Sequence, residues 1–197
     1  MSVTMSTSPP GHPSAWEPLI DATVDHFRIF RVRRTRFRHA REAREAEFVV
    51  IDSNDWVNVV AVTDHGELVL VRQFRFGRNE FTLEIPGGMV EHGEDPVAAG
   101  VRELREETGY VGRAARILGR VHPNPAIQSN TCHIVLVEGV QRLTETQFDF
   151  NEEIELSVRP VEEVFALAES GAITHALVLD ALFFLRPWWE QRKAGTV

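Results

Sequence analysis

The segment 86–110, which reads PGGMVEHGEDPVAAGVRELREETGY, constrains the fold of this chain more than any other stretch. It opens on a glycine pair, which permits a tight turn and lets the backbone approach another group closely. Asp95 then supplies a favoured helix N-cap, Pro96 suits the first helical position, and Gly109 is a natural C-terminal stop. We therefore expect a turn followed by one short helix.

The expected helix has an apolar side and an acidic side. The apolar positions at helical spacing, which predict the core face, are Val97, Val101, Leu104 and Thr108. Glu103, Glu106 and Glu107 lie three and four positions apart on the other side, where like charges repel. A solvated acidic surface is one reading of this cluster. The other is a site for Mg²⁺ or Mn²⁺, because these ions require hard oxygen ligands.

Composition narrows the class of protein. The chain has 197 residues, 43% of them hydrophobic, which suits one domain with an appended N-terminal element. Cys132 is the only cysteine, so an internal disulfide framework and a cysteine-rich zinc site are excluded and a reducing, cytoplasmic compartment is expected. The formal net charge of −8 argues against nonspecific binding to nucleic acid or anionic membranes.

The ends of the chain and its apolar runs support the same class. Residues 1–15 are rich in Ser, Thr and Pro and are expected to form a disordered tail. No apolar run reaches the roughly 18 residues that a membrane span needs. We therefore expect no membrane association.

Alternating and β-branched runs predict a strand-rich chain. The expected strands are 25–39, 47–52, 56–63, 67–76, 81–86, 132–140 and 156–159. Two further helices are expected over 160–171 and 174–185. This order of mostly antiparallel strands and few helices predicts an α+β fold or a three-layer sandwich.

The fixed residues of the first segment match a known signature. Their order and spacing resemble the Nudix box of the Nudix hydrolases at Gly88, Glu94, Arg102, Glu103, Glu106, Glu107 and Gly109. The one departure is Tyr110, where the family usually has an aliphatic residue. The resemblance implies a Nudix fold, a mixed-sheet α/β/α sandwich, with the N-terminal strands as an added antiparallel sheet.

The resemblance also implies roles for the residues of the box. Glu103, Glu106 and Glu107 correspond to ligands of a divalent metal, Mg²⁺ or Mn²⁺, and the carbonyl group of Gly87 is a further candidate ligand. Glu106 counts among the catalytic candidates as well. Glu94 and Arg102 correspond to a pair that braces the loop against the helix.

Flanking motifs resemble one subgroup of the family. The stretches LVRQFRFG, TLEIPGG and HPNPAIQSNTCHIVLVEGV are similar to those of enzymes that cleave ADP-ribose and other nucleoside diphosphate sugars. Such enzymes usually carry the general base on an acidic loop after the box. The corresponding loop here, 146–156, offers Glu152 as the first choice and Glu153 as the second, with Glu155 next. A solvated surface loop remains the alternative.

Three further residues are candidates for binding the substrate. Arg75 resembles the phosphate-binding arginine of the subgroup and suits bidentate phosphate contacts. Glu84 is expected either to bind a substrate hydroxyl group or to support the site. Trp56 is expected either to stack on a base or to pack in the core. His122 and His133 are interpreted as structural residues.

The arginine-rich run 28–44 has two readings. Nucleic-acid binding is disfavoured by its interspersed Glu42 and by the acidic chain as a whole. The subgroup instead exchanges its N-terminal strands across a homodimer, which implies the organisation 1–15 tail, 16–55 dimer-forming strands and 56–197 Nudix domain. The implied reaction is Mg²⁺-dependent hydrolysis of ADP-ribose, GDP-mannose or a similar compound to a nucleoside monophosphate and a sugar phosphate.

Two alternatives stay open. One is a Nudix hydrolase of another substrate, such as an oxidised nucleoside triphosphate or a capped RNA. The other is a non-catalytic sensor of sugar nucleotides. The sequence does not distinguish the base or the sugar of the substrate.

Overall fold

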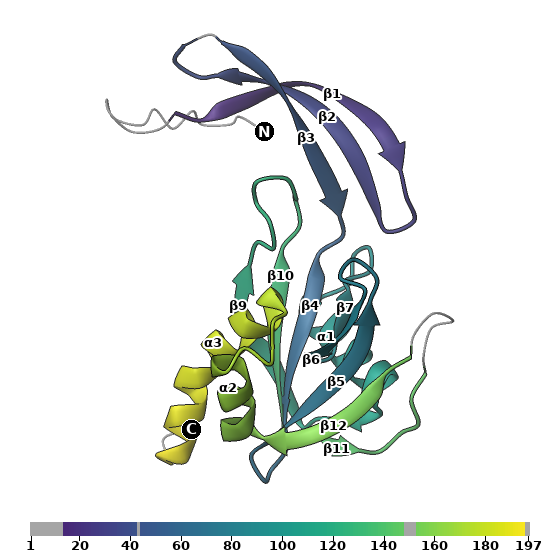
Figure 1. The fold of residues 1–197 in the computed structure, drawn as a ribbon, viewed down its shortest axis with the longest axis vertical. Helices are drawn as coiled ribbons and strands as arrows, with labels where there is room; N and C mark the ends of the chain where they lie inside the picture. Colours follow the sequence, from purple (N-terminus) through teal and green to yellow (C-terminus); the bar gives the residue numbers. More distant parts are fainter. Residues whose placement is uncertain (1–13, 43, 148–152, 196–197) are drawn as a thin grey trace. The chain divides into compact units, whose positions relative to one another are not determined.

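The computed structural model describes residues 14–42, 44–147 and 153–195 of the chain (Figure 1). The chain divides into two compact units. The first takes in Met1–Ser53 and Asn124–Ser129, and the second takes in Asn54–Pro123 and Asn130–Val197. The expected tail, 1–15, lies almost wholly outside the described residues.

The first unit contains a three-stranded antiparallel sheet in the order β1-β2-β3. Its strands are β1 (Trp16–His26), β2 (Phe30–His39) and β3 (Glu45–Ser53). The prediction of a single strand over 25–39 was wrong at its start. The chain turns there, because the Phe27 N–H donates to the Phe30 carbonyl oxygen at 2.8 Å. The residues before this turn form β1.

Arginines of β2 pair with acidic residues on both neighbouring strands. Arg33 Nε lies 2.5 Å from Asp52 Oδ2, and Arg33 Nη1 lies 2.8 Å from Asp21 Oδ1. The other cross-strand pairs are Arg31–Asp52, Arg36–Glu47 and Arg38–Glu45. Burial by itself raises the pKa of Asp52, but hydrogen bonds from Arg33, Ser129 and Arg31 outweigh it and lower that pKa to about 2. Several of these arginines therefore serve the sheet itself.

The second unit is built on a seven-stranded mixed sheet whose main path is β12-β5-β4-β10-β9. Its strands are β4 (Trp56–Val62), β5 (Glu67–Arg75), β6 (Glu80–Glu84), β7 (Gly87–Met89), β9 (Ala114–Val121), β10 (Cys132–Glu138) and β12 (Glu155–Pro160). β10 runs parallel to β4 and antiparallel to β9. Two short strands, β8 (Tyr110–Val111) and β11 (Gln141–Arg142), form a separate pair.

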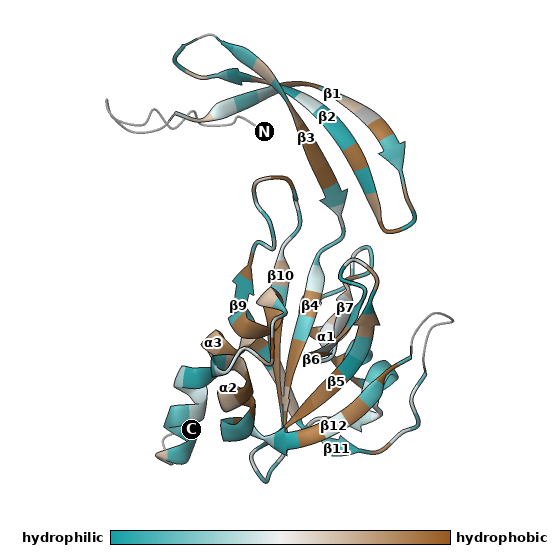
Figure 2. Ribbon diagram, viewed as in Figure 1, coloured by the Kyte–Doolittle hydropathy of each residue, from teal (hydrophilic) through white to brown (hydrophobic). Residues whose placement is uncertain are grey.

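Helices cover both faces of this sheet (Figure 1). One core packs Val59 and Val135 of the sheet against Leu104 of α1 (Pro96–Thr108). The other packs the opposite face against α2 (Val161–Glu169) and α3 (Ala176–Lys193). Hydrophobic residues run along β10 and the start of β5, between these layers (Figure 2). The predicted α+β sandwich is confirmed.

The helices also test the local predictions. α1 begins and ends where expected: Asp95 Oδ1 accepts hydrogen bonds from two first-turn N–H groups, and Gly109 has a φ of 73°. α3 continues well past the predicted end at 185, to Lys193, although Pro187 lies inside it. Burial of Trp188 and Trp189 offsets the cost of that proline. Within the described ranges, no helix combines the length and apolar character that crossing a membrane requires.

The second unit opens where β4 and β5 separate. These two strands pair only at Val62 and Leu68. Beyond that point β6 pairs with β5, and β7 pairs with β4. The chain passes from β6 to β7 through Ile85 and Pro86. The prediction of a tight turn at the glycine pair was wrong, because Gly87 and Gly88 are strand residues of β7 that pair with Asn58 and Val57 of β4. The sheet therefore carries the predicted site residues to its open end.

Candidate active site

The glycine pair of β7 lies directly against α1. The Gly87 N–H donates a hydrogen bond of 3.0 Å to Glu107 Oε2. A Cβ atom placed on Gly88 would lie 2.5 Å from the Glu103 carboxyl carbon, closer than real contacts allow. Glycine thus leaves room for the Glu103 carboxylate to lie close against the backbone.

Glu107 is buried, with 4% of its surface exposed. The expectation that the acidic side of α1 lies wholly opposite the core was therefore wrong for this residue. Its position, three residues after Leu104, turns it toward the packed side of the helix. The Gly87 N–H offsets part of the cost of burying its charge.

Arg102 is the centre of the remaining polar contacts. Its Nε and Nη2 each donate 2.9 Å hydrogen bonds to the two carboxylate oxygens of Glu94, and Nη2 also donates to the Met89 carbonyl oxygen at 2.9 Å. Arg102 Nη1 lies 2.8 Å from Glu103 Oε1 and 3.3 Å from Glu106 Oε2. The hydrogen bond from Arg102 holds the pKa of Glu94 below its usual range. Arg102 and Glu94 thus link the loop after β7 to α1.

The carboxylates suit a divalent cation in kind. Glu103, Glu106 and Glu107 supply hard oxygen donors on one helix beside a closely approaching backbone. Their side chains are spread between Arg102 and the Gly87 N–H, and among the described residues no three His, Cys, Asp or Glu side chains converge as a metal site. Binding a cation would therefore require these side chains to turn toward one point.

Arg75 and Glu84 form a second polar centre. Arg75 Nε and Nη2 donate to the two oxygens of Glu84 at 2.7 and 2.6 Å, and Thr82 Oγ1 donates to Glu84 Oε1 at 2.5 Å. The Glu84 side chain is 3% exposed, whereas that of Arg75 is 42% exposed. Burial by itself raises the pKa of Glu84, but the hydrogen bonds from Arg75 and Thr82 outweigh it and lower that pKa. The geometry suits Glu84 to holding the half-exposed guanidinium of Arg75.

Trp56, His133 and Cys132 each contact other parts of the protein or lie in its core. Trp56 is partly buried and packs against the core cluster on the α2 and α3 face. His133 Nε2 lies 3.0 Å from Asp55 Oδ2. Cys132 is fully buried, and burial raises the pKa of its thiol to about 12. These contacts favour the packing reading of Trp56 over stacking on a base.

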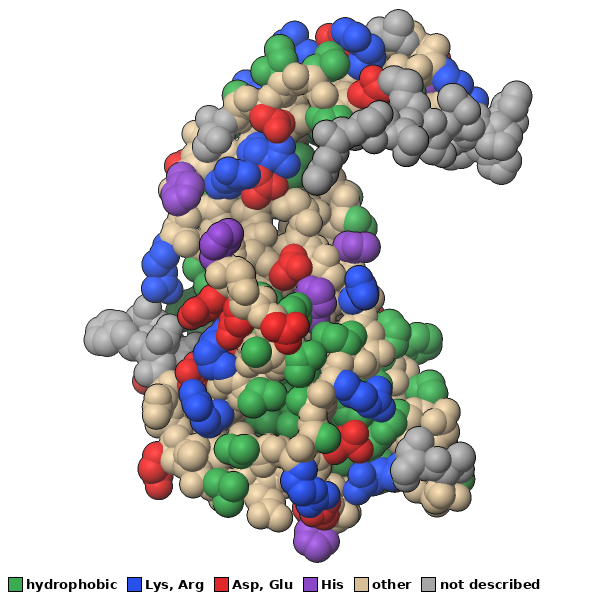
Figure 3. All heavy atoms as spheres, turned by 180° about the vertical axis from the view of Figure 1, so that it is seen from behind, with side chains coloured by type: hydrophobic (Ala, Val, Ile, Leu, Met, Phe, Trp, Pro, Cys, Tyr) green, Lys and Arg blue, Asp and Glu red, His purple; other side chains and the backbone are tan. Residues whose placement is uncertain are grey.

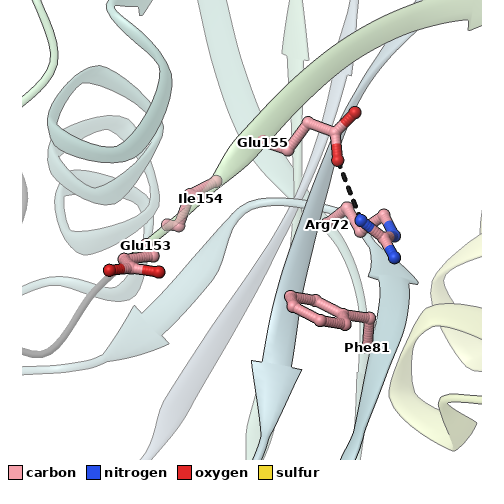
Figure 4. A pocket seen from close by; sticks show the side chains of 5 residues that line it. All are labelled: Arg72, Phe81, Glu153, Ile154 and Glu155. Atoms are coloured by element: carbon pink, nitrogen blue, oxygen red, sulfur yellow. Dashed lines mark hydrogen bonds and ion pairs between the residues drawn. The ribbon is translucent and has the colours of Figure 1, made fainter.

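A cavity of about 250 Å³ lies beside the end of the acidic loop. Its lining comes from β5, β6 and the segment that enters β12, and consists of Arg72, Phe81, Glu153, Ile154 and Glu155 (Figure 4). Arg72 Nη1 donates to Glu155 Oε2 at 3.0 Å, and its guanidinium lies 4.3 Å from the centre of the Phe81 ring. Glu153 thus lines a cavity, while Glu152 lies outside the described residues.

Sequence reasoning missed Arg72 and Phe81. Both come to the cavity through strand register, since Arg72 pairs with Glu155 across β5 and β12 and lies opposite Leu83 of β6. Residues 72 and 155 are far apart along the chain. The one sequence feature that pointed to Arg72 was its place beside Gln73 in the stretch LVRQFRFG.

Comparison with known proteins shows the family to which the chain belongs. A family model described as "NUDIX domain" matches residues 53–182. The chain is 33% identical over 131 residues to an ADP-ribose pyrophosphatase of Bacillus subtilis, covering 66% of this chain and 71% of that protein. It is 44% identical over 89 residues to an ADP-sugar pyrophosphatase of Mus musculus, covering 43% and 41% of the two chains.

A solved structure extends the likeness to the fold. The crystal structure of an ADP compounds hydrolase superposes with a TM-score of 0.81 at 23% identity, covering 94% of this chain and 99% of the other. The predicted Nudix fold is thereby confirmed. With the glycine pair of β7, the acidic helix and the family match together, the chain belongs to the Nudix hydrolases, as a pyrophosphohydrolase grouped with the ADP-ribose and nucleoside diphosphate sugar pyrophosphatases.

Proposed function

We propose that this enzyme hydrolyses the diphosphate bond of a nucleoside diphosphate sugar in the presence of Mg²⁺, with ADP-ribose as the first candidate substrate and GDP-mannose as the second. The observation that carries the proposal is the acidic helix α1 held against Gly87 and Gly88 of β7. The names of the bacterial and mouse relatives, which refer to ADP-ribose and ADP-sugars, support the choice of substrate.

The residues of the site take the following roles in the proposal. Glu103, Glu106, Glu107 and the Gly87 carbonyl group would hold the metal, which supplies charge stabilisation at the diphosphate oxygens. Arg75, positioned by Glu84, contacts a phosphate group. Glu94 and Arg102 hold the loop and the helix together.

The general base is assigned to the acidic loop. Glu152 remains the first choice, and Glu153 is supported by its position at the cavity beside Arg72. A base must come within about 3 Å of the attacking water, directly or with the movement of its loop. Separate Glu152→Gln and Glu153→Gln variants will identify it, since only loss of the base should lower kcat with little change in KM.

The proposal extends to the assembly and the compartment. The first unit has few buried residues and many exposed apolar ones, which are Leu19, Ile20, Val24, Phe48 and Val49 on the strands and Phe27 and Ile29 in the turn between β1 and β2. Hydrophobic and charged side chains are interspersed over its surface in the view of Figure 3. We assign these strands, within 16–55, to a homodimer contact and residues 56–197 to the catalytic domain. The single buried thiol of Cys132 supports a cytoplasmic location.

A substrate panel tests the reaction. Purified protein with Mg²⁺ is assayed for phosphomonoester release from ADP-ribose, GDP-mannose, UDP-glucose, NADH and 8-oxo-dGTP. We expect preference for a sugar nucleotide and a loss of at least about 100-fold in kcat in Glu107→Gln. The variant is close in shape, and its amide oxygen can still accept the Gly87 N–H.

Glu163→Gln is the matched control, because Glu163 lies on α2 and pairs with Arg159. It should retain full activity. Turnover of 8-oxo-dGTP alone would contradict the proposed substrate. Tight binding of ADP-ribose by the parent protein without any cleavage would instead favour the sensor.

A further inference from the structure

His175 brings a third side chain to the Arg75–Glu84 pair. It is the N-cap residue of α3, on the layer that covers the opposite face of the sheet from α1. Its Nε2 lies 3.8 Å from Glu84 Oε2, within the range of an ion pair but beyond that of a hydrogen bond, and 29% of its side chain is exposed. Its Nδ1 is buried and has no hydrogen-bond partner among the described residues. Of the two ring nitrogens, Nε2 is therefore the one with a polar neighbour, Glu84.

Glu84 depends on its neighbours more than Arg75 does. Its carboxylate is almost wholly buried and is compensated by donors from Arg75 and Thr82. Arg75 is the more exposed partner and is the proposed phosphate contact. A phosphate group that binds Arg75 weakens the interaction of Arg75 with Glu84. That interaction is the main compensation for the buried charge of Glu84. A third donor beside Glu84 would reduce that cost.

The surroundings of His175 determine which nitrogen carries the proton. Burial lowers the pKa of His175, Glu84 opposes that effect and Arg75 adds to it, so the ring is neutral near pH 7. A proton on Nδ1 would leave a buried N–H without an acceptor and would turn the Nε2 lone pair toward a carboxylate. A proton on Nε2 faces Glu84 instead. The Nε2–H tautomer is therefore favoured.

We propose that His175 is a positioning residue, whose Nε2–H steadies Glu84 and thereby holds Arg75 in place for the diphosphate of the substrate. The part that concerns the diphosphate rests on the proposed function. The part that concerns His175 and Glu84 does not depend on the substrate. The start of α3 thus lies beside Glu84 at the end of β6.

The tautomer is tested without substrate. NMR of protein labelled at histidine, with His175→Gln used to assign the signal, reports the tautomer through the Cδ2 and ring-nitrogen shifts. We expect the Nε2–H form in the parent protein and a changed signal in Glu84→Gln. A predominantly Nδ1–H ring, or a signal that does not respond to Glu84→Gln, would overturn the proposal.

Kinetics test the positioning role with two amide variants. The amide nitrogen of Gln reaches the place of Nε2, whereas that of Asn reaches only the place of Nδ1. We expect KM for ADP-ribose to rise about fivefold in His175→Ala and His175→Asn with kcat nearly unchanged, and to return close to the parent value in His175→Gln. Equal effects of all three substitutions, or an effect on kcat alone, would contradict it.

Thr174→Ala is the control for the helix start, because Thr174 is the exposed neighbouring residue. It should leave KM unchanged. If the parent protein cleaves no sugar nucleotide, the proposed function fails, and the tautomer measurement still decides whether His175 serves Glu84.

Discussion

At the scale of single residues, three neighbouring glutamates occupy three different environments. Glu107 is buried and accepts a backbone N–H, Glu103 lies against Gly88 and Arg102, and Glu106 is the most exposed of the three. Their spacing on the helix predicted that they are neighbours. Their environments depend on Gly87 and Gly88 of β7, which pack against α1. Similar residue types in one motif therefore need not respond alike to substitution.

Gly88→Ala tests the narrow space beside Glu103. The new Cβ would meet only the end of a flexible side chain, so the fold should persist while the carboxylate is displaced. We expect a loss of about 10- to 100-fold in Mg²⁺ affinity, measured by titration calorimetry, with little change in Tm. Gly77→Ala is the control, since nothing lies within 4 Å of its Cβ position. Unchanged Mg²⁺ binding in Gly88→Ala would remove Glu103 from the metal ligands.

At the scale of elements, α1 is positioned at both ends and along its length. Asp95 caps its first turn, Gly109 ends it, and Gly100 lets it approach β10 closely. A Cβ on Gly100 would lie 3.0 Å from a methyl carbon of Val135. The glycine therefore costs helix propensity but permits close packing of helix and sheet. The close contact with Val135 explains why Gly100 lies inside a helix, where glycine is otherwise unfavourable.

Asp95→Ala tests the cap of α1. Losing the acceptor of the Val97 and Ala98 N–H groups should lower the free energy of unfolding by about 1 kcal/mol, measured by denaturant titration. Asp95→Ser keeps an acceptor at the same place and should recover most of the loss. Equal destabilisation by both substitutions would show that Asp95 acts through its charge rather than as a cap.

At the scale of the whole molecule, the two units are stabilised differently. The second has two packed cores, whereas the described strands of the first bury only Thr35 and His39. Cross-strand ion pairs join its strands, and the more exposed ones, such as Arg36–Glu47, add little stability. A three-stranded sheet with so many exposed apolar residues is typical of a surface that another chain covers.

The proposed homodimer is tested by changing this surface. Ile20→Asp and Val49→Asp place charges at apolar positions that are 62% and 52% exposed. We expect each to raise the dissociation constant of the dimer by at least about tenfold in sedimentation equilibrium. Leu143→Asp, at an apolar residue of the second unit that is 67% exposed, is the control. A parent protein that sediments as a monomer at all concentrations would refute the assembly.

The sequence by itself determined the features that depend on neighbours along the chain. Capping residues marked the bounds of α1, β-branched runs marked the central strands, and helical spacing grouped the glutamates of the box. It failed at β9, whose apolar and polar residues do not alternate cleanly, and at the end of α3, where tertiary burial of Trp188 and Trp189 outweighs Pro187. Interactions between neighbours along the chain determine an element only where they outweigh tertiary packing.

Only the tertiary structure decided which distant residues meet. The burial of Glu107, the pairing of Arg75 with Glu84, and the approach of His175 all depend on strand register and on the layers above the sheet. These contacts join residues from separate elements, and their free energies come from burial and long-range charge pairing. A pattern along the sequence does not show burial or long-range charge pairing. The motif therefore predicts the chemistry, while the fold determines which residues hold the site in place.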